Sequence, residues 1–192
     1  MTRIAILTGS TRDGRRSEAV AQWVAQYAEK RDDAEFALVD LAEFDLPMFS
    51  EATPPSLGKP PSDPRVRRWA AEIEKFDGFV FITPEYNHSV PGVLKNAVDH
   101  LFLQWHHKAA GFVSYGSAGG VRAVEQLRLI LAEVKVATVR SQVFLSLFTD
   151  FTITDPSEPG EFTPGEQHEA PLNAMFDELV AWTDALAPLR SA

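Results

Sequence analysis

Three short segments of the chain carry groups that could bind a small polar ligand. Residues 9–17 read Gly-Ser-Thr-Arg-Asp-Gly-Arg-Arg-Ser and combine hydroxyls, arginines and glycines. Residues 85–89, Glu-Tyr-Asn-His-Ser, lie between Pro84 and Pro91, and residues 116–120 read Gly-Ser-Ala-Gly-Gly. Hydroxyls, guanidinium groups and the backbone N–H groups at the start of a helix bind phosphate in proteins. The first segment therefore predicts a phosphate site, with the other two as its neighbours.

Residues 9–17 approach two known phosphate-binding motifs and match neither. A Walker A loop needs Lys and then Ser or Thr after its second glycine, but Arg15 and Arg16 stand there. A dinucleotide fingerprint needs a middle glycine so that a pyrophosphate can approach closely, but position 11 is Thr. An ATPase and a Rossmann-type NAD site are both disfavoured.

A site for one monophosphate, such as that of FMN, remains compatible with this segment. Its donors would be the N–H groups before the helix and the side chains of Ser10, Thr11, Ser17 and either Arg12 or Arg16. For this segment alone, an alternative is equally well supported. In that alternative the hydroxyls make turn hydrogen bonds and the arginines only solvate the surface.

The elements that must position these segments are strands alternating with helices. Strands are expected at residues 3–8, 36–41, 78–83, 109–115 and 136–147, the last with a bend. Helices are expected from an N-cap at Ser17, at 65–76, after Pro91, at 121–134 and at 172–186. This order predicts an α/β fold: a flavodoxin-like, doubly wound, five-stranded parallel sheet in a three-layer α/β/α sandwich.

The polar segments each follow an expected strand directly. Ligands of open parallel sheets bind beyond the carboxyl ends of the strands, because loops and helix N-termini converge there. Two further segments, residues 47–64 and 149–165, are rich in proline and polar residues and are expected as exposed connections. The first of these is a candidate flap over the site.

Composition narrows the class of protein. At 192 residues, with 45% hydrophobic residues and no visible repeat, we expect a single domain over residues 1–192. The absence of cysteine excludes a thiol nucleophile and fits a cytoplasmic setting. A net charge of −9 argues against nucleic acid and anionic membranes as partners. Small molecules and further copies of the chain are the expected partners.

Three motifs together resemble one family. These are GSTR at residues 9–12, PEYNHSVPGVLKNAVD at 84–99 and YGSAGGVRA at 115–123. With them the chain resembles the NADPH-dependent FMN reductase family of flavodoxin-like oxidoreductases, which includes bacterial quinone, azo-dye and chromate reductases. The family is commonly dimeric or tetrameric, so the resemblance implies a homodimer or homotetramer with the helix after Pro91 in the interface. His100 stands where many relatives have an aromatic residue.

The resemblance also implies roles for individual residues. Ser10, Arg12 and Ser17 would hold the FMN phosphate. The edge and face of the isoalloxazine would be lined by Pro84, Glu85, Tyr86 and Asn87, and its other wall by Ser117, Gly119 and Gly120. For Glu85, a carboxylate that caps local N–H groups is at least as well supported as a general base.

The leading hypothesis is therefore an FMN-dependent enzyme that takes hydride from NADPH or NADH and reduces quinones, flavins or other small electron acceptors. Because the cofactor carries the chemistry, no acid or base side chain is obligatory and no catalytic residue is named. No metal site is expected, since His106 and His107 are not spaced as a metal pair. The alternatives are a flavodoxin-like electron carrier that docks a protein partner, and a scaffold that has lost flavin binding.

Overall fold

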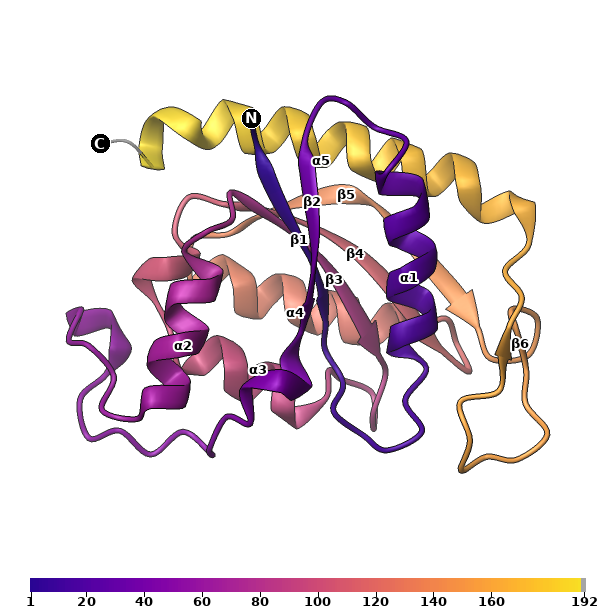
Figure 1. Cartoon of the computed structure of the whole chain (residues 1–192), viewed down its shortest axis with the longest axis horizontal. Helices are drawn as coiled ribbons and strands as arrows, with labels where there is room; N and C mark the ends of the chain where they lie inside the picture. Colours follow the sequence, from indigo (N-terminus) through magenta and orange to yellow (C-terminus); the bar gives the residue numbers. More distant parts are fainter. Residues whose placement is uncertain (191–192) are drawn as a thin grey trace.

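The computed structural model describes residues 1–190, which are built around one five-stranded parallel sheet (Figure 1). The strands follow the order β2-β1-β3-β4-β5 across the sheet. Their bounds are Arg3–Thr8 (β1), Glu35–Asp40 (β2), Gly78–Pro84 (β3), Ala109–Gly116 (β4) and Ala137–Ser146 (β5). This confirms the predicted flavodoxin-like strand order.

Helices cover both faces of the sheet. Their bounds are Ser17–Ala28 (α1), Pro64–Ile73 (α2), Gly92–Asp99 (α3), Val121–Glu133 (α4) and Glu169–Arg190 (α5). One hydrophobic cluster joins α1 and α5 to one face, and a second joins α2, α3 and α4 to the other. The predicted three-layer sandwich is thus confirmed. Within residues 1–190, no helix combines the length and apolarity needed to cross a membrane.

The central strand β3 shows how the sequence separates the two layers. All its residues are buried, and successive side chains point to opposite faces. Phe79 and Phe81 belong to the cluster with α2, α3 and α4, whereas Val80 and Ile82 belong to the cluster with α1 and α5. A strand buried on both faces reads as a continuous apolar run, which is why its position could be predicted.

Three helices differ from the prediction at their ends. Helix α2 ends at Ile73, three residues before the predicted end at 76. The N-cap of α1 is Arg16, so Ser17 lies inside the first turn, and the helix begins without a side-chain cap. The last helix, α5, begins at Glu169 and ends at Arg190, several residues beyond the predicted 172–186 at both ends. Helix ends are defined by local backbone geometry, which periodicity locates only to within a few residues.

The proline-rich segment 47–64 is irregular apart from one 3₁₀ turn at Pro55–Leu57. Its first residues are attached to α3. Asn96 Nδ2 donates to the backbone carbonyl of Pro47 at 2.9 Å, and Asn96 Oδ1 accepts from the N–H of Phe49 at 2.8 Å. His100 Nε2 donates to the same Pro47 carbonyl at 2.7 Å. His100 and Asn96 together therefore anchor the start of this segment.

Residues 151–162 form a small hairpin that the sequence reading did not predict. Its two-residue strands β6 (Phe151–Thr152) and β7 (Glu161–Phe162) pair in antiparallel fashion. Their aromatic rings pack 4.9 Å apart, and Trp23 of α1 lies edge-on to Phe162 at 5.9 Å. Two-residue strands are too short to show alternation, so only the exposed connection was predicted. We refer to residues 151–162 as the strap.

The base of the strap is held by a buried carboxylate. Asp150 is 2% exposed, and its Oδ1 lies 2.8 Å from His168 Nε2. Its Oδ2 accepts from the backbone N–H of Ser146 at 2.8 Å and from the Thr149 hydroxyl at 3.1 Å. Burial alone would raise the pKa of Asp150, but these hydrogen bonds and the His168 ring outweigh it and lower the pKa. The ionised carboxylate therefore stabilises the fold.

Replacing this carboxylate should lower stability in a pH-dependent way. The pKa of Asp150 is lower in the folded than in the unfolded state. Its contribution to the free energy of unfolding is therefore present above the unfolded pKa of about 3.9 and is lost as the pH falls through the folded pKa. Asp150→Asn is expected to cost about 1–3 kcal/mol near pH 7. The deficit relative to the parent should shrink below about pH 4. Urea unfolding at pH 7, 4 and 3 measures this, with the exposed Asp32→Asn as control. A deficit independent of pH would contradict it.

Candidate functional site

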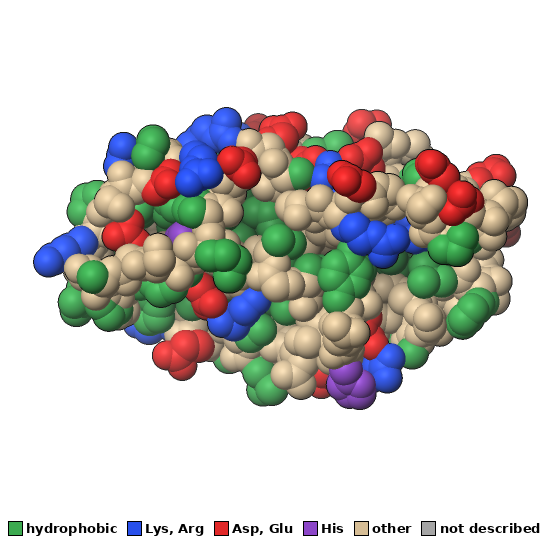
Figure 2. Space-filling view, turned by 90° about the horizontal axis from the view of Figure 1, so that it is seen from below, with side chains coloured by type: hydrophobic (Ala, Val, Ile, Leu, Met, Phe, Trp, Pro, Cys, Tyr) green, Lys and Arg blue, Asp and Glu red, His purple; other side chains and the backbone are tan. Residues whose placement is uncertain are grey.

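The three predicted segments meet at the carboxyl edge of the sheet. They form the β1–α1 loop (residues 9–16), the β3–α3 loop (85–91) and the β4–α4 loop (117–120), which follow three neighbouring central strands. Helix α1 packs on one face and α3 on the other, so the chain diverges between β1 and β3. Ligands of open α/β sheets bind at such a switch point. Figure 2 looks onto this edge, where basic side chains gather beside acidic ones around a mostly uncharged middle.

In the β1–α1 loop, the buried polar groups point to a ligand. Ser10 and Ser17 are fully buried, and Arg16 is 8% exposed. Arg16 Nη2 donates to the backbone carbonyl of Glu158 at 2.9 Å. Within residues 1–190, the Nε atoms of Arg15 and Arg16 and the Ser17 Oγ are buried and have no hydrogen-bond partner of good geometry, although the Ser17 hydroxyl lies near that of Tyr115. Buried donors are normally paired, so this group of atoms lacks a partner such as an anion.

Helix α1 adds to this environment. It begins at Ser17 without a side-chain cap, so the N–H groups of its first turn have no side-chain acceptor. The N-terminus of a helix also carries a partial positive charge that favours anions. A free N-terminus beside a guanidinium and a buried hydroxyl can hold one phosphate group.

The three arginines of this loop differ in their environments. Arg15 Nη2 lies 2.6 Å from Asp40 Oδ2 and also pairs with Glu18, so its charge is already balanced. Arg12 is exposed, and its Nη2 donates weakly to the carbonyl of Pro156 at 3.3 Å. Arg16 contacts a neutral carbonyl and pairs with no carboxylate of residues 1–190. Of the three, Arg16 is the buried cation whose charge is not balanced by a carboxylate.

The β3–α3 loop contacts the β1–α1 loop through Tyr86. The hydroxyls of Tyr86 and Ser10 share a hydrogen bond of 2.9 Å. Asn87 and His88 have φ angles of 50° and 73°, and Tyr86 exchanges backbone hydrogen bonds with Ser89 across them. This is the geometry of a type I′ turn with left-handed central residues. Asn87 thus lies at the exposed tip of a tight turn.

Glu85 joins the β3–α3 loop to helix α4. Its carboxylate accepts from the backbone N–H of Arg122 at 3.2 Å and forms an ion pair with the Arg122 guanidinium. Its own N–H donates to the carbonyl of Tyr115 at 3.2 Å, directly after Pro84 ends β3. The capping alternative for the Glu85 carboxylate is therefore what the structure shows. The backbone of residues 84–85 remains at the edge of the site.

The β4–α4 loop is shaped by close backbone packing. Gly119 donates its N–H to the carbonyl of Gly116 at 3.0 Å, and its own carbonyl accepts from the Ser114 hydroxyl at 2.7 Å. Gly120 is the N-cap of α4 and has a φ of 71°. Ser117 is exposed at the tip. The loop thus presents backbone groups and one hydroxyl beside the Glu85 backbone.

The structure adds one side chain that the sequence reading missed. Tyr115, near the end of β4, is 5% exposed, and burial raises the pKa of its hydroxyl. The Tyr86 hydroxyl raises it further, whereas Ser17 and Arg16 oppose the shift. Tyr115 therefore lies among the residues of the first two loops. The sequence did offer one indication of this role, because Tyr115 is the first residue of the YGSAGGVRA motif.

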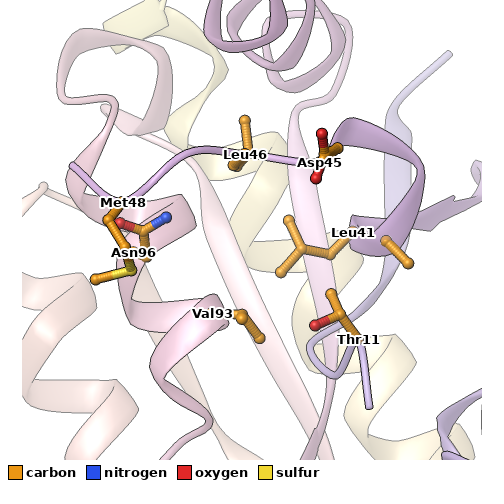
Figure 3. A pocket seen from close by; sticks show the side chains of 8 residues that line it. Thr11, Leu41, Asp45, Leu46, Met48, Val93 and Asn96 are labelled. Atoms are coloured by element: carbon orange, nitrogen blue, oxygen red, sulfur yellow. The ribbon is translucent and has the colours of Figure 1, made fainter. Parts of the chain in front are cut away.

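A cavity of about 400 Å³ opens beside Thr11. Figure 3 shows its side chains converging from the β1–α1 loop, the segment after β2, and α3. Five of the eight lining residues are apolar, namely Leu41, Ala42, Leu46, Met48 and Val93, and three are polar, namely Thr11, Asp45 and Asn96. Thr11 is exposed and lines this cavity, whereas Ser10 and Ser17 are buried. A mostly apolar cavity with few polar groups suits a small organic molecule.

Comparison with known proteins identifies the chain. Residues 2–150 match the family model for NADPH-dependent FMN reductase. The chain belongs to this family. An NAD(P)H-dependent FMN reductase of Schizosaccharomyces pombe is 32% identical over 178 residues, which cover 92% of this chain and 88% of the relative. A quinone reductase of Escherichia coli K12 is 32% identical over 149 residues, covering 74% and 76% respectively.

A solved structure agrees with the fold. FerB, a flavoenzyme NAD(P)H:(acceptor) oxidoreductase from Paracoccus denitrificans, superimposes with a TM-score of 0.69 at 22% identity, covering 96% of this chain and 98% of FerB. At that identity the likeness concerns the fold alone. The family match and the two sequence relatives establish an oxidoreductase of the NAD(P)H-dependent FMN reductase and quinone reductase type. The predicted family and enzyme class are confirmed.

The residues assigned to FMN lie within the part that matches this FMN reductase family. They gather at one edge of the sheet, on the three loops described above. Their individual roles in binding stay predictions. The strap lies beyond the matched residues, and its contacts with Arg12 and Arg16 use backbone carbonyls that no sequence motif could reveal.

Proposed function

We propose that this chain binds FMN at the three loops and uses it to reduce small acceptors with NADPH or NADH. The observation that carries the proposal is the pair of buried, unpartnered groups at the start of α1, Arg16 Nε and Ser17 Oγ. Together with the uncapped N-terminus of α1, they fit a monophosphate that would satisfy them. The residues present therefore match the cofactor after which the family is named.

The remaining predicted residues would position the flavin ring. The hydrogen bond between the hydroxyls of Ser10 and Tyr86 joins the loop that carries the phosphate donors to the β3–α3 loop. Pro84 has no N–H group, and the N–H groups of Glu85, Tyr86 and Gly119 already donate to backbone carbonyls. The edge of the ring would therefore lie against the backbone of residues 84–87 and the loop with Ser117, Gly119 and Gly120, with Asn87 and Ser117 as N–H donors. Arg12, exposed above the β1–α1 loop, would add charge to the phosphate. Thr11 would line the cavity.

Bound FMN supplies the redox chemistry, accepting a hydride from reduced nicotinamide and passing electrons to the acceptor. The contribution of the protein is to orient the ring and leave one face open, so no acid or base side chain is assigned a catalytic role. The cavity of about 400 Å³ beside Thr11 fits a flat apolar acceptor such as a quinone. The names of the relatives support quinones or azo dyes as acceptors.

The test is a visible spectrum. Purified protein is mixed with FMN, freed of unbound flavin, and titrated with NADPH without oxygen. We expect retained flavin absorbance that bleaches promptly and returns when quinone is added. Retained flavin that neither NADPH nor NADH bleaches would instead favour the electron carrier, and no retained flavin would contradict the proposal.

We also propose that the protein is a homodimer or homotetramer with α3 at the interface. Several large apolar side chains are exposed on α3 and the neighbouring loops, namely Met48, Leu57, Val93 and Leu103. Exposed apolar groups gathered in one region are typical of interaction surfaces. Size-exclusion chromatography with light scattering tests this, and a monomer at micromolar concentration would contradict it.

A further inference from the structure

The strap touches the β1–α1 loop with three consecutive backbone carbonyl groups. Pro156 O accepts from Arg12 Nη2 at 3.3 Å, and Glu158 O accepts from Arg16 Nη2 at 2.9 Å. Between them, Ser157 O lies so close to Gly14 that a Cβ atom there would be 2.2 Å away. Gly14 has a φ of 63°, so no other residue would fit as well. The strap therefore forms a wall against this loop.

The wall consists of hydrogen-bond acceptors and acidic side chains. The carbonyls of Pro156 and Glu158 each accept one N–H from a guanidinium group. A guanidinium has five N–H donors, so both arginines keep donors for an anion. Asp155 and Glu158 are exposed on the same turn. Hydrogen bonds from the Ser157 hydroxyl and N–H hold the pKa of Asp155 below its usual value, so it stays ionised. This surface stabilises the arginines of the β1–α1 loop and repels any anionic group that extends past them toward the strap.

The strap is a built element of the fold. Its base is fixed by Asp150 and His168, and its short strands pair with each other. The Thr163 N–H donates to the carbonyl of Asp150 at 2.9 Å, and Phe162 packs against Trp23 of α1. In Figure 1 this orange hairpin lies at the same end of the sheet as the indigo β1–α1 loop. Its turn is thus held in place beside the two arginines.

We propose that the strap limits the bound flavin to the monophosphate, so that the protein accepts FMN and rejects FAD. This inference rests on the proposed function, in which the flavin phosphate lies at Arg16 and Ser17. FMN ends at that phosphate. FAD continues with a second phosphate and an adenosine, which would meet the carbonyls of residues 156–158 and the carboxylates of Asp155 and Glu158. Repulsion by those oxygens, together with the lack of space at Gly14, disfavours the longer cofactor.

Flavin binding, measured by calorimetry or by quenching of flavin fluorescence, tests this without enzyme turnover. We expect the parent protein to bind FMN more than about tenfold more tightly than FAD. One variant replaces residues 153–160 with Asn-Gly, a two-residue turn that suits a hairpin. A second, Asp155→Asn with Glu158→Gln, keeps the backbone and removes two charges. In both, the preference for FMN should fall, by about tenfold in the shortened strap.

The matched control is Asp32→Asn with Glu133→Gln, which removes two exposed carboxylates, one after the end of α1 and one on the last residue of α4. It should leave the ratio of FMN to FAD affinity unchanged. Equal affinity of the parent for both flavins would overturn the role of the strap, as would an unchanged ratio in the charge variant. In those cases FMN binding itself would still support the proposed function. A protein that binds neither flavin would overturn both. Circular dichroism verifies that each variant folds. If the variant with the shortened strap does not fold, the charge variant alone tests the role of the strap.

Discussion

Replacing Arg16 with alanine is expected to weaken FMN binding about ten- to hundredfold while leaving riboflavin binding nearly unchanged. Arg16 is 8% exposed, contacts a neutral carbonyl, and has an unpartnered Nε beside the equally unpartnered Ser17 Oγ. A charge-assisted hydrogen bond to a phosphate is among the stronger polar contacts, and its loss affects only a ligand that carries the phosphate. Fluorescence titration with the two flavins measures the difference.

The neighbouring arginines provide the comparison for this prediction. Arg15→Ala removes the same charge from the same loop, but Arg15 is already paired with Asp40 and Glu18. We expect it to change FMN affinity less than about threefold and to lower stability instead. The loss of FMN affinity in Arg12→Ala should lie between the losses in the other two variants, because Arg12 is exposed. A larger loss of FMN affinity for Arg15→Ala than for Arg16→Ala would refute the assignment of Arg16.

Replacing Gly120 with alanine is expected to destabilise the fold by about 2–4 kcal/mol. Gly120 has a φ of 71°, which only glycine adopts without strain. A Cβ atom there would lie 2.9 Å from the backbone N and O of Tyr115 and from the Cβ of Ser114, so β4 itself would have to move. Because Tyr115 lies in the site, FMN affinity should fall as well. Urea unfolding gives the change in free energy.

Gly92 supplies a matched control for this substitution. It is the first residue of α3, and a Cβ atom there would meet nothing within 4 Å. Gly92→Ala is therefore expected to be neutral or to stabilise by up to about 1 kcal/mol, through the reduced entropy of the unfolded chain. If Gly120→Ala unfolded at the same urea concentration as Gly92→Ala, the close packing of the β4–α4 loop would be of no energetic importance.

The sheet and the location of the site could be predicted from sequence because their signals are local. A strand such as β3, buried on both faces, shows a continuous apolar run. Each of the three polar segments follows such a strand directly, and parallel strands place their carboxyl ends at one edge. The family motifs also lie in these segments. The fold, the family and the meeting of the three loops at one edge thus followed from patterns a few residues long.

The strap and the capping of α1 could not be predicted in the same way. The two-residue strands of the strap have no periodicity, and their pairing depends on contacts with Trp23 and on the Asp150–His168 pair. Ser17 resembles an N-cap, but the structure makes Arg16 the cap and buries the Ser17 hydroxyl near that of Tyr115, with no hydrogen bond of good geometry within residues 1–190. The same hydroxyl is then better suited to a ligand than to its own helix.

By itself, the sequence determined that arginines and hydroxyls follow the first strand, and that glycine-rich and proline-bounded loops lie beside them. Which of the arginines is available for a ligand depends on the contacts made in the folded protein. Arg15 is neutralised by Asp40 of the neighbouring strand, whereas Arg16 is covered by the carbonyl of Glu158, 142 positions away in the sequence. The charge of a guanidinium is given by its residue type, but its availability depends on partners that folding brings from distant parts of the chain.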